Sequence, residues 1–279
     1  MGRETALALH AQGVTVYAVA RRPMPELEEH GIHTFAMDVT DDESMRAGVA
    51  SILEAEGHID ILINNAGYGS YGAIEEVPIA EAHHEFDVNV FGAMRLTQLV
   101  LGSMTARGRG RIVNISSMAG KFAMALGGWY HATKYALEAL SDALRQEVRP
   151  FGVDVVLIEP GLIHTNWSTI AADSLRSTSG LGKYSLIARN FASALDFAND
   201  RFATDPAVLG RVIAHAALTR HPRTRYRKGM GSLTPVIINH LPDRLVDAAI
   251  QFTLTRLDSI LDFLSTKAAT ASVTETVSV

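Results

Sequence analysis

The sequence alternates short apolar runs with longer amphipathic segments, and this alternation is what most narrows the folds open to it. The apolar runs have the length and the β-branched content of buried strands, and the segments between them have helical periodicity. The expected strands lie at residues 14–20, 32–37, 59–63, 111–116 and 153–158. Because strands that alternate with helices normally pair in parallel, we predict an α/β fold with a doubly wound, mainly parallel sheet and helices on both faces.

The expected helices lie at residues 3–12, 42–56, 80–104, 129–150 and 206–218, and a last strand is expected at 224–227. With 279 residues, of which 47% are hydrophobic, the chain can build one packed core, and no linker or charge block divides it. We expect one domain over residues 1–264, with a mobile substrate lid within residues 166–201. Residues 265–279 lack helical periodicity and are expected to form a disordered tail.

Composition excludes several classes of function. The net charge of −5, with scattered basic residues, gives no sign of a surface for nucleic acid. The lack of cysteine excludes disulfides and thiolate metal sites and is compatible with the cytoplasmic location that we expect. The apolar region at 245–264 contains Asp247, Arg256, Asp258 and Asp262. These charges favour an amphipathic helix, packed on the domain or on a partner subunit, over a membrane span.

The stretch 117–134 carries the residues best suited to proton transfer. Tyr130 and Lys134 are four residues apart, so on a helix both side chains leave the same face. An ammonium beside a phenol favours the phenolate, so we expect Lys134 to lower the pKa of Tyr130 toward neutrality. Ser117 follows the expected strand 111–116 and can donate to a substrate oxygen. The Tyr/Lys pair alone is weakly specific, since a half-buried Tyr130 and a solvated Lys134 explain it equally well.

Several motifs, taken together and in order, resemble the short-chain dehydrogenase/reductase family. They are Asn64-Asn65-Ala66-Gly67, Asn89, Ser117, Tyr130-x-x-x-Lys134 and Pro160-Gly161-x-x-x-Thr165. The resemblance is specific because independent motifs keep the family's spacing from Gly2 to about Thr165. It implies a Rossmann-like fold and an NAD(P)-dependent oxidoreductase that interconverts a carbonyl and an alcohol on a small molecule.

The resemblance also implies a role for each matching residue. Tyr130 would exchange the proton, Ser117 would bind the substrate oxygen, and Lys134 would hold the nicotinamide ribose. Asn89 would complete a proton relay through a water; the alternative is a solvent-facing polar residue. For Asp38, which the resemblance places beside the adenine of the cofactor, the structural alternative is a turn or helix-capping residue. Cofactor contacts are implied for Gly2, Arg21, Arg22, Asp38, Val39, Asn65, Ala66, Gly67, Tyr130, Lys134, Pro160, Gly161, Ile163 and Thr165.

The end of the second family strand indicates which nicotinamide cofactor binds. Family members that prefer NAD commonly have an acidic residue there, to meet the ribose 2′-hydroxyl, whereas this chain has Ala20 followed by Arg21 and Arg22. Guanidinium groups suit a 2′-phosphate. We therefore expect NADP, with NAD as the alternative cofactor. The alternative interpretation of Arg21 and Arg22 is that they are solvated side chains at a strand end and bind no cofactor.

The N-terminal region departs from the family pattern. Family members have a strand and a glycine-rich turn, T-G-x-x-x-G-x-G, before the first helix, and here Met1-Gly2 matches only the last two positions. In the doubly wound order this first strand lies between the second and fourth strands, so we expect two strand edges without their shared partner. We also expect the natural start to lie upstream of Met1.

Substrate and assembly are less constrained. An apolar wall of Tyr68, Tyr71, Met124, Leu126, Trp129, Trp167 and Ile170 favours a lipophilic ketone or alcohol. By family analogy we expect a homodimer or homotetramer that uses helices 80–104 and 129–150. One alternative function is a non-catalytic binding or regulatory protein with this fold and impaired cofactor binding. Another is a sugar-nucleotide epimerase or dehydratase, although the Asn64–Gly67 and Pro160-Gly161 motifs fit the reductases better.

Overall fold

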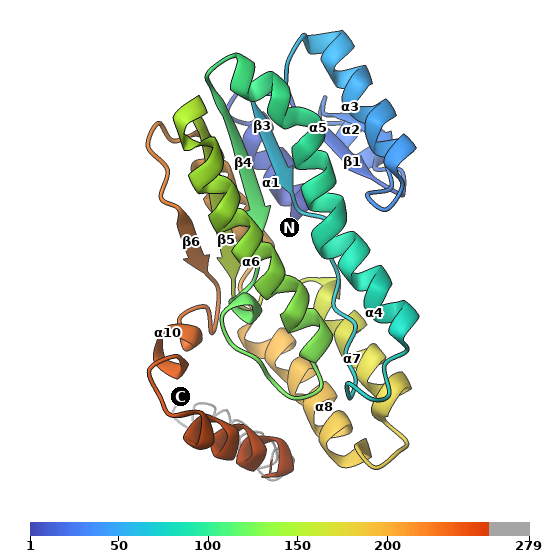
Figure 1. Ribbon diagram of the computed structural model, residues 1–279. Coiled ribbons are helices and arrows are strands. Elements are labelled where there is room, and N and C mark those ends of the chain that lie inside the picture. The colour runs from blue at the N-terminus through green and yellow to red at the C-terminus, as the bar shows by residue number, and fades with distance from the viewer. Residues whose placement is uncertain (257–279) are drawn as a thin grey trace, which may run out of the picture.

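The computed structural model describes residues 1–256, which form an α/β fold with parallel strands (Figure 1). Four strands pair in the order β3-β4-β5-β6, and β1 and β2 form a separate pair. Their bounds are β1 Tyr17–Ala20, β2 His33–Ala36, β3 Ile61–Asn64, β4 Gly110–Ile115, β5 Val153–Pro160 and β6 Arg225–Lys228. The predicted α/β class and the six strand positions are thus confirmed, with ends shifted by up to a few residues.

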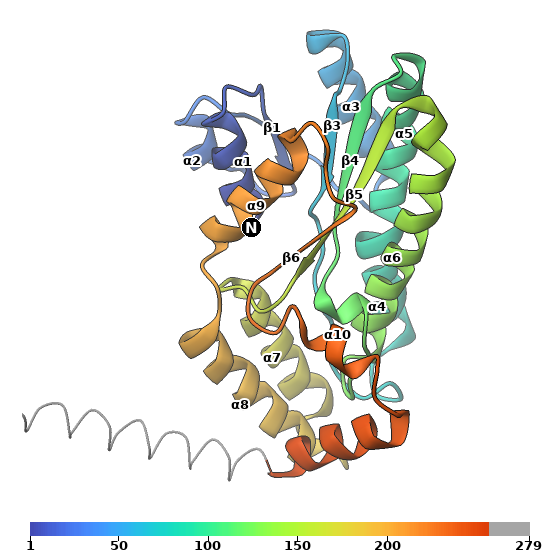
Figure 2. The same cartoon turned by 90° about the vertical axis from the view of Figure 1, so that its left-hand side faces the viewer.

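The helices cover both faces of the larger sheet. In Figure 2, α1 and α9 lie on one face, α5 and α6 lie on the other, and α7 and α8 lie beyond the carboxyl ends of the strands. The labelled α-helices are α1 Gly2–His10, α2 Pro25–Glu28, α3 Asp42–Glu56, α4 Ile79–Phe86, α5 Ala93–Ala106, α6 Gly128–Val148, α7 Asn166–Ser179, α8 Ser185–Phe202, α9 Pro206–Leu218 and α10 Thr234–Ile238. Short π or 3₁₀ segments are η1 Asp87–Gly92, η2 Met118–Gly120 and η3 Arg149–Phe151.

Helix ends follow capping residues that are visible in the sequence. The side chain of Asp41 accepts hydrogen bonds from the backbone N–H groups of Glu43 and Ser44, which fixes the start of α3. Gly57 ends that helix with a φ of 74°, a left-handed conformation that glycine adopts without strain. Similarly, Asp205 caps α9, whose first residue is Pro206. For these two helices the predicted and observed bounds agree.

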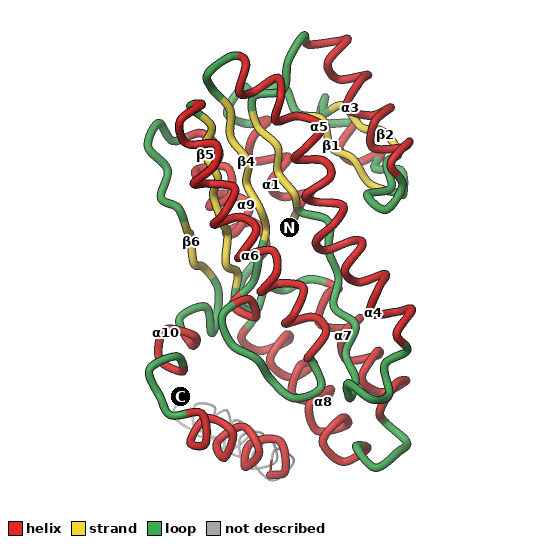
Figure 3. The backbone as a smooth tube through the Cα atoms, viewed as in Figure 1, coloured by secondary structure: helices red, strands yellow, loops and turns green. Residues whose placement is uncertain are grey.

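No strand lies between β1 and β3 within residues 1–256, so the sheet divides there as predicted. The division is bridged by side chains instead of backbone hydrogen bonds. Val14 and Val16, at the entrance to β1, belong to the same apolar cluster as Ile61 and Ile63 of β3. Figure 3 shows α1 behind this division, with the N-terminus near the carboxyl end of β3. Apolar packing therefore connects the β1–β2 pair to the four-stranded sheet at this point.

One predicted helix differs in the structure, and the segment expected to contain the lid is helical, while its role as a lid stays a prediction. The helix expected at 80–104 is interrupted by the π-helical segment η1, which separates α4 from α5. The Ser/Thr-rich lid segment 166–201 is a pair of packed helices, α7 and α8, because Thr165 caps α7 and small apolar residues such as Ala172 and Ala192 bury between them. The predicted tail at 265–279, and the end of the predicted domain at 264, lie outside the described residues.

The expected amphipathic region at 245–264 is described as far as residue 256. Residues 243–256 are helical, and Leu254 is buried against the α7–α8 pair. The Leu254 carbonyl accepts a hydrogen bond of 3.1 Å from the Asn190 side chain of α8. No helix within residues 1–256 has the length and the apolar content needed to cross a membrane. This C-terminal helix thus packs on the domain, as predicted.

Candidate active site

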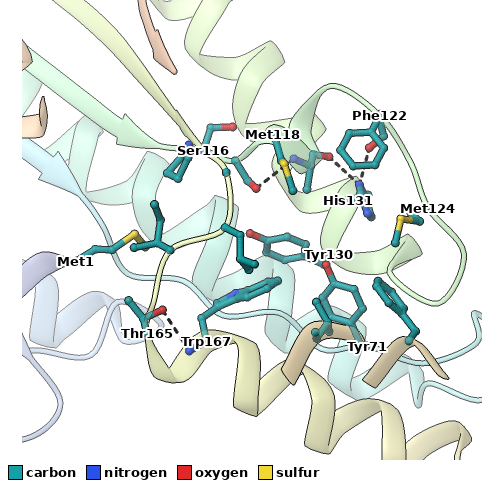
Figure 4. Close-up of a pocket in the computed structure, with 18 residues that line it drawn as sticks. Met1, Tyr71, Ser116, Met118, Phe122, Met124, Tyr130, His131, Thr165 and Trp167 are labelled. Carbon is teal, nitrogen blue, oxygen red and sulfur yellow. Dashed lines mark hydrogen bonds between the residues drawn. The ribbon is translucent and has the colours of Figure 1, made fainter. Parts of the chain in front are cut away.

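Four polar side chains predicted to carry the chemistry lie together at the carboxyl end of the larger sheet. Tyr130 and Lys134 leave the same face of α6 and are 6% and 5% exposed. Ser117 follows β4, and Asn89 lies in η1. Figure 4 shows Tyr130 inside a cavity, with the loop that follows β4 beside it. The structure thus buries Tyr130 and Lys134, which excludes the interpretation of Lys134 as a solvated helix residue.

The Ser117 hydroxyl is held at the cavity wall by local structure. Ser117 is extended, with a φ of −164°, and begins the short helix η2. Its Oγ accepts a 3.1 Å hydrogen bond from the backbone N–H of Ala119. Because that bond uses an oxygen lone pair, the hydroxyl hydrogen stays available for an oxygen in the cavity.

The ionisation of Tyr130 differs from the sequence prediction. Burial raises the pKa of Tyr130 above its usual value of 10.0; hydrogen bonding with Ser117 opposes this rise and the nearby Glu85 adds to it. Lys134 does not offset the rise. Its Nζ donates to the carbonyl of Ile115 at 3.0 Å and lies 5.8 Å from the centre of the Tyr130 ring. The expectation that Lys134 lowers the pKa of Tyr130 is therefore wrong for this structure, and the phenol is protonated.

Burial also affects Lys134 itself. It lowers the pKa of Lys134 from 10.5 to about 8, although the charges of Glu85 and Glu138 favour the ammonium. The group is therefore largely charged at neutral pH but can lose its proton in mildly alkaline solution. A buried amine with this pKa is suited to pass a proton as well as to hold a ligand hydroxyl.

Asn89 is a buried bracing residue. It is 1% exposed, so the solvent-facing alternative is wrong. Its Nδ2 donates to the carbonyl of Tyr68 at 2.8 Å and to the hydroxyl of Thr133 at 3.0 Å, and its Oδ1 accepts from the N–H of Tyr68 at 3.0 Å. The π-helical segment η1 aims the side chain inward at this point. Asn89 thus ties the loop after β3 to the turn of α6 that carries Tyr130 and Lys134.

Sequence reasoning missed Glu85, which supports the same loop. It lies one helical turn before Asn89 and is fully buried, and one of its oxygens accepts from the N–H of Ser70 at 2.9 Å. Burial raises the pKa of Glu85 to about 8, although the backbone N–H of Ser70 and the charge of Lys134 favour the carboxylate. The signal in the sequence was the spacing of four residues between Glu85 and Asn89, which places both on one helix face.

The cavity around Tyr130 is mostly apolar. Of the predicted wall, Tyr71, Met124 and Trp167 line it. Leu126 is instead buried in the core behind the cavity, and Ile170 is 49% exposed. Tyr68 and Trp129 also lie outside the cavity wall. The remaining lining residues are Met1, Ser116, Ser117, Met118, Ala119, Phe122, His131, Pro160, Gly161, Leu162, Ile163, Thr165, Phe191 and Leu195.

The predicted loop after β5 forms one side of this cavity. Pro160, Gly161, Ile163 and Thr165 all line it. Gly161 is required by a close approach, because a Cβ there would lie 2.0 Å from the carbonyl oxygen of Met230. The Thr165 hydroxyl also caps α7 by accepting from the N–H of Trp167 at 3.4 Å. The structure therefore brings this loop and Tyr130 to the same cavity.

In the motif at the end of β3, some side-chain atoms are hydrogen-bonded within the protein and others have no partner. Asn64 braces the sheet, since its Nδ2 donates to Asn114 of β4 at 2.8 Å and to the carbonyl of Ala93 at 3.2 Å. Asn65 has a buried Oδ1 without a hydrogen-bond partner among the described residues. Ala66 and Gly67 are exposed. The Oδ1 of Asn64 is likewise buried without a partner among the described residues, but only Asn65 lies against Gly2 at the start of α1.

The remaining predicted contacts surround the ends of β1, β2 and α1. Arg21 and Arg22 are exposed after β1. Asp38 accepts from the N–H and hydroxyl of Thr40 at 2.9 and 2.8 Å, which confirms its role in a turn. These bonds, with the charge of Arg21, lower the pKa of Asp38. Val39 follows it, and Gly2 begins α1 directly against the Asn65 side chain.

Comparisons with known proteins agree with this arrangement. A sequence model described as short chain dehydrogenase matches residues 1–174. The 3-ketodihydrosphingosine reductase of Bacteroides thetaiotaomicron is 32% identical over 91% of this chain and 92% of its own length. A Helicobacter pylori protein named "Probable short-chain type dehydrogenase/reductase VdlC" is 40% identical over 62% of this chain and 65% of its own length. The crystal structure of a short-chain dehydrogenase from Streptomyces avermitilis superposes with a TM-score of 0.70 at 29% identity, covering 94% of this chain and 93% of that one.

Proposed function

This chain belongs to the short-chain dehydrogenase/reductase family of oxidoreductases, and we propose that it interconverts a lipophilic ketone and its alcohol with NADP as the redox cofactor. The single observation that carries the proposal is the buried Tyr130 phenol in an apolar cavity, beside the Ser117 hydroxyl and the loop 160–165. Burial keeps the phenol protonated. A protonated acid next to a carbonyl binding site suits the reduction direction, in which the substrate oxygen gains a proton.

The residues around the cavity fit a nicotinamide cofactor. The Oδ1 atom of Asn65 is buried and has no partner among the described residues, so it can accept from a bound hydroxyl or amide. The first backbone bond within α1 runs from the N–H of Thr5 to the carbonyl of Met1, which lines the cavity, so the N–H groups before Thr5 have no intrahelical partners. Free N–H groups at a helix start suit a phosphate. Lys134 and Thr165 would hold the nicotinamide end, where the bound cofactor supplies the hydride.

The protein side of the reaction follows from these positions. Ser117 donates to the carbonyl oxygen and stabilises the negative charge that develops on it. Tyr130 donates its proton to the same oxygen, and Lys134 supplies a mobile proton one helical turn away. Asn89 fixes the loop and the helix turn that hold these groups in register. In the oxidation direction the same groups accept the proton.

The lipophilic substrate class follows from the cavity wall. Tyr71, Met118, Met124, Phe191 and Leu195 surround the space beside Tyr130 with apolar surface. A sugar would leave several hydroxyls without partners there, and each unpaired buried polar group costs about 1–3 kcal/mol. The name of the Bacteroides relative, a reductase of 3-ketodihydrosphingosine, supports a ketone with a long apolar chain.

A series of straight-chain alkyl ketones tests this substrate class. We expect NADPH-dependent reduction whose kcat/KM rises with chain length, because each additional buried CH₂ contributes about 0.8 kcal/mol until the cavity is filled. Initial rates of NADPH oxidation measure it. A preference for short polyhydroxy aldehydes over every alkyl ketone would contradict the proposal.

The preference for NADP is proposed from Arg21 and Arg22. Both are exposed at the end of β1, where nothing in residues 1–256 binds their guanidinium groups. Replacing both by Ala should raise the KM for NADPH roughly 10- to 100-fold, because hydrogen bonds to a charged group contribute about 1.5–3 kcal/mol. The KM for NADH should change little and serves as the internal control. An equal change in the KM for NADPH and for NADH would show that the two arginines do not bind the 2′-phosphate.

A homodimer or homotetramer is proposed from the outer faces of the long helices. Phe91 in η1 is 60% exposed, and Tyr135 and Leu140 on α6 are 44% and 40% exposed. Apolar side chains on neighbouring helices favour burial against a second copy.

The non-catalytic alternative is disfavoured by the cavity, because a binding protein does not require a buried phenol, a serine hydroxyl and a buried lysine at one point.

A further inference from the structure

His131 adds a hydrogen-bond acceptor to the cavity wall, next to the proposed acid. It follows Tyr130 on α6, is 4% exposed and lines the same cavity. The centres of the two rings are 6.2 Å apart. The neighbouring wall residues Met118, Phe122 and Met124 present apolar surface. A polar atom of His131 would therefore give a substrate a hydrogen-bonding partner on an otherwise apolar part of the wall.

The protonation of His131 follows from its contacts. Its Nδ1 lies 2.9 Å from the carbonyl oxygen of Ala119 and 2.5 Å from that of Phe122. Carbonyl oxygens only accept, so Nδ1 must carry the hydrogen. Burial lowers the pKa of His131, although these two carbonyls oppose the shift, and the ring is neutral at neutral pH. In the neutral ring with a proton on Nδ1, Nε2 has a free lone pair and accepts a hydrogen bond.

The ring orientation places Nε2 on the side of the ring opposite the Ala119 and Phe122 carbonyls, next to Gly127 and Tyr71. Figure 4 shows Nδ1 bound to the Ala119–Phe122 loop and the other nitrogen at the opposite end of the ring. None of the hydrogen bonds within residues 1–256 uses Nε2. Gly127 permits this orientation, because a Cβ there would lie 2.9 Å from Cδ2 of His131, 3.2 Å from its Nε2 and 2.7 Å from the Tyr71 ring. A larger residue at 127 would displace one of the two rings.

We propose that Nε2 of His131 accepts a hydrogen bond from a hydroxyl group of the substrate, so that the preferred substrates are lipophilic β-hydroxy ketones. This inference rests on the proposed function, since it places the reacting carbonyl at Tyr130 and Ser117. Both residues line the cavity and their ring centres are 6.2 Å apart, so the inference places the substrate hydroxyl a few bonds from the carbonyl carbon, at Nε2, with the carbonyl oxygen at Tyr130. The apolar chain then extends between Tyr71 and Phe191. His131 is a specificity residue in this scheme and exchanges no proton.

A matched pair of substrates tests the inference: an alkyl ketone, and the same ketone with a hydroxyl on the β-carbon. The wild-type protein should favour the hydroxy ketone about tenfold in kcat/KM, which corresponds to one net hydrogen bond at the upper end of its usual contribution. Rates of NADPH oxidation with each ketone give the ratio.

The variant His131→Asn separates recognition from structure. The Asn amide nitrogen takes the place of Nδ1 and can still donate to the carbonyls of Ala119 and Phe122, but no atom replaces Nε2. We expect His131→Asn to lower kcat/KM for the hydroxy ketone about tenfold more than for the alkyl ketone, so that the preference for the hydroxy ketone is lost. In His131→Gln the amide oxygen reaches the position of Nε2, so part of the preference should return.

Three results would overturn the inference. The first is a wild-type protein that does not distinguish the two ketones, and the second is an unchanged preference in His131→Asn. The third is an equal loss of both activities in His131→Asn, which would assign His131 a structural role only. A wild-type protein that reduces neither ketone contradicts the proposed function itself, and this outcome is distinct because no variant is needed to observe it.

Discussion

Replacement of Tyr130 by Phe should lower kcat for ketone reduction about 10²- to 10⁴-fold, the usual contribution of a positioned acid. The change removes one oxygen from a residue that is 6% exposed and packed against Tyr71 and Trp167, with ring centres 5.7 and 5.1 Å away. Because Phe keeps the ring, the packing and the cofactor contacts should remain. Steady-state kinetics with NADPH, together with an NADPH fluorescence titration, measure the two effects separately.

Tyr135 provides the matched control for this variant. It lies on the same helix, is 44% exposed, and lines no part of the cavity. Tyr135→Phe should therefore leave kcat unchanged. If Tyr130→Phe retained wild-type kcat, the proton would have to come from another group, and the role proposed for Tyr130 would be wrong.

Replacement of Arg225 by Met should lower the free energy of unfolding by about 3 kcal/mol, the lower end of the range for removing one partner of a buried ion pair. Arg225 of β6 contacts Glu138 at 3.0 Å, Asp142 at 2.7 Å and Glu159 at 2.9 Å. The side chains of Glu138 and Glu159 are 4% and 1% exposed, so their charges cannot return to water without unfolding. We expect the lower end of that range of free energies because Glu138 and Glu159 each keep a second cationic partner, Lys121 and Arg227 respectively.

Urea unfolding monitored by circular dichroism measures this loss. Arg223→Met is the control, since Arg223 is exposed and no ion pair within residues 1–256 involves it. A surface change of this kind should stay within about 0.5 kcal/mol of the wild type. Equal stabilities for Arg225→Met and Arg223→Met would show that the ion-pair cluster makes no net contribution to the free energy of unfolding.

Much of the fold could be predicted because apolar periodicity and capping residues act locally. Asp41 and Gly57 mark both ends of α3 in the sequence, and Asp205 and Pro206 mark the start of α9. The interruption at η1 could not be located in the same way. It depends on the partners of Asn89, which lie 21 and 44 residues away in the chain. The helical character of 166–201 depends on burial against the core, and serine and threonine content does not report that burial.

The positions of the site residues could be predicted where a sequence motif identifies them. The ionisation of those residues could not, because burial determines their pKa values. Ser117, Tyr130 and Lys134 were identified by spacing, and the structure brings them together. The direction of the Tyr130 pKa was wrong because the sequence shows the nearby lysine and not the low dielectric around both groups. His131 was passed over, since one histidine on a helix carries no spacing signal of its own.

The proposed reaction is tested most directly by following the hydride. The wild-type chain would be incubated with an alkyl ketone and NADPH deuterated at the transferring position of the nicotinamide, and the alcohol analysed by mass spectrometry. Direct transfer predicts an alcohol that carries one deuterium on the former carbonyl carbon, and this product should be nearly absent with Tyr130→Phe. An alcohol without deuterium, or no alcohol from a chain that binds NADPH, would contradict an oxidoreductase that acts at this cavity.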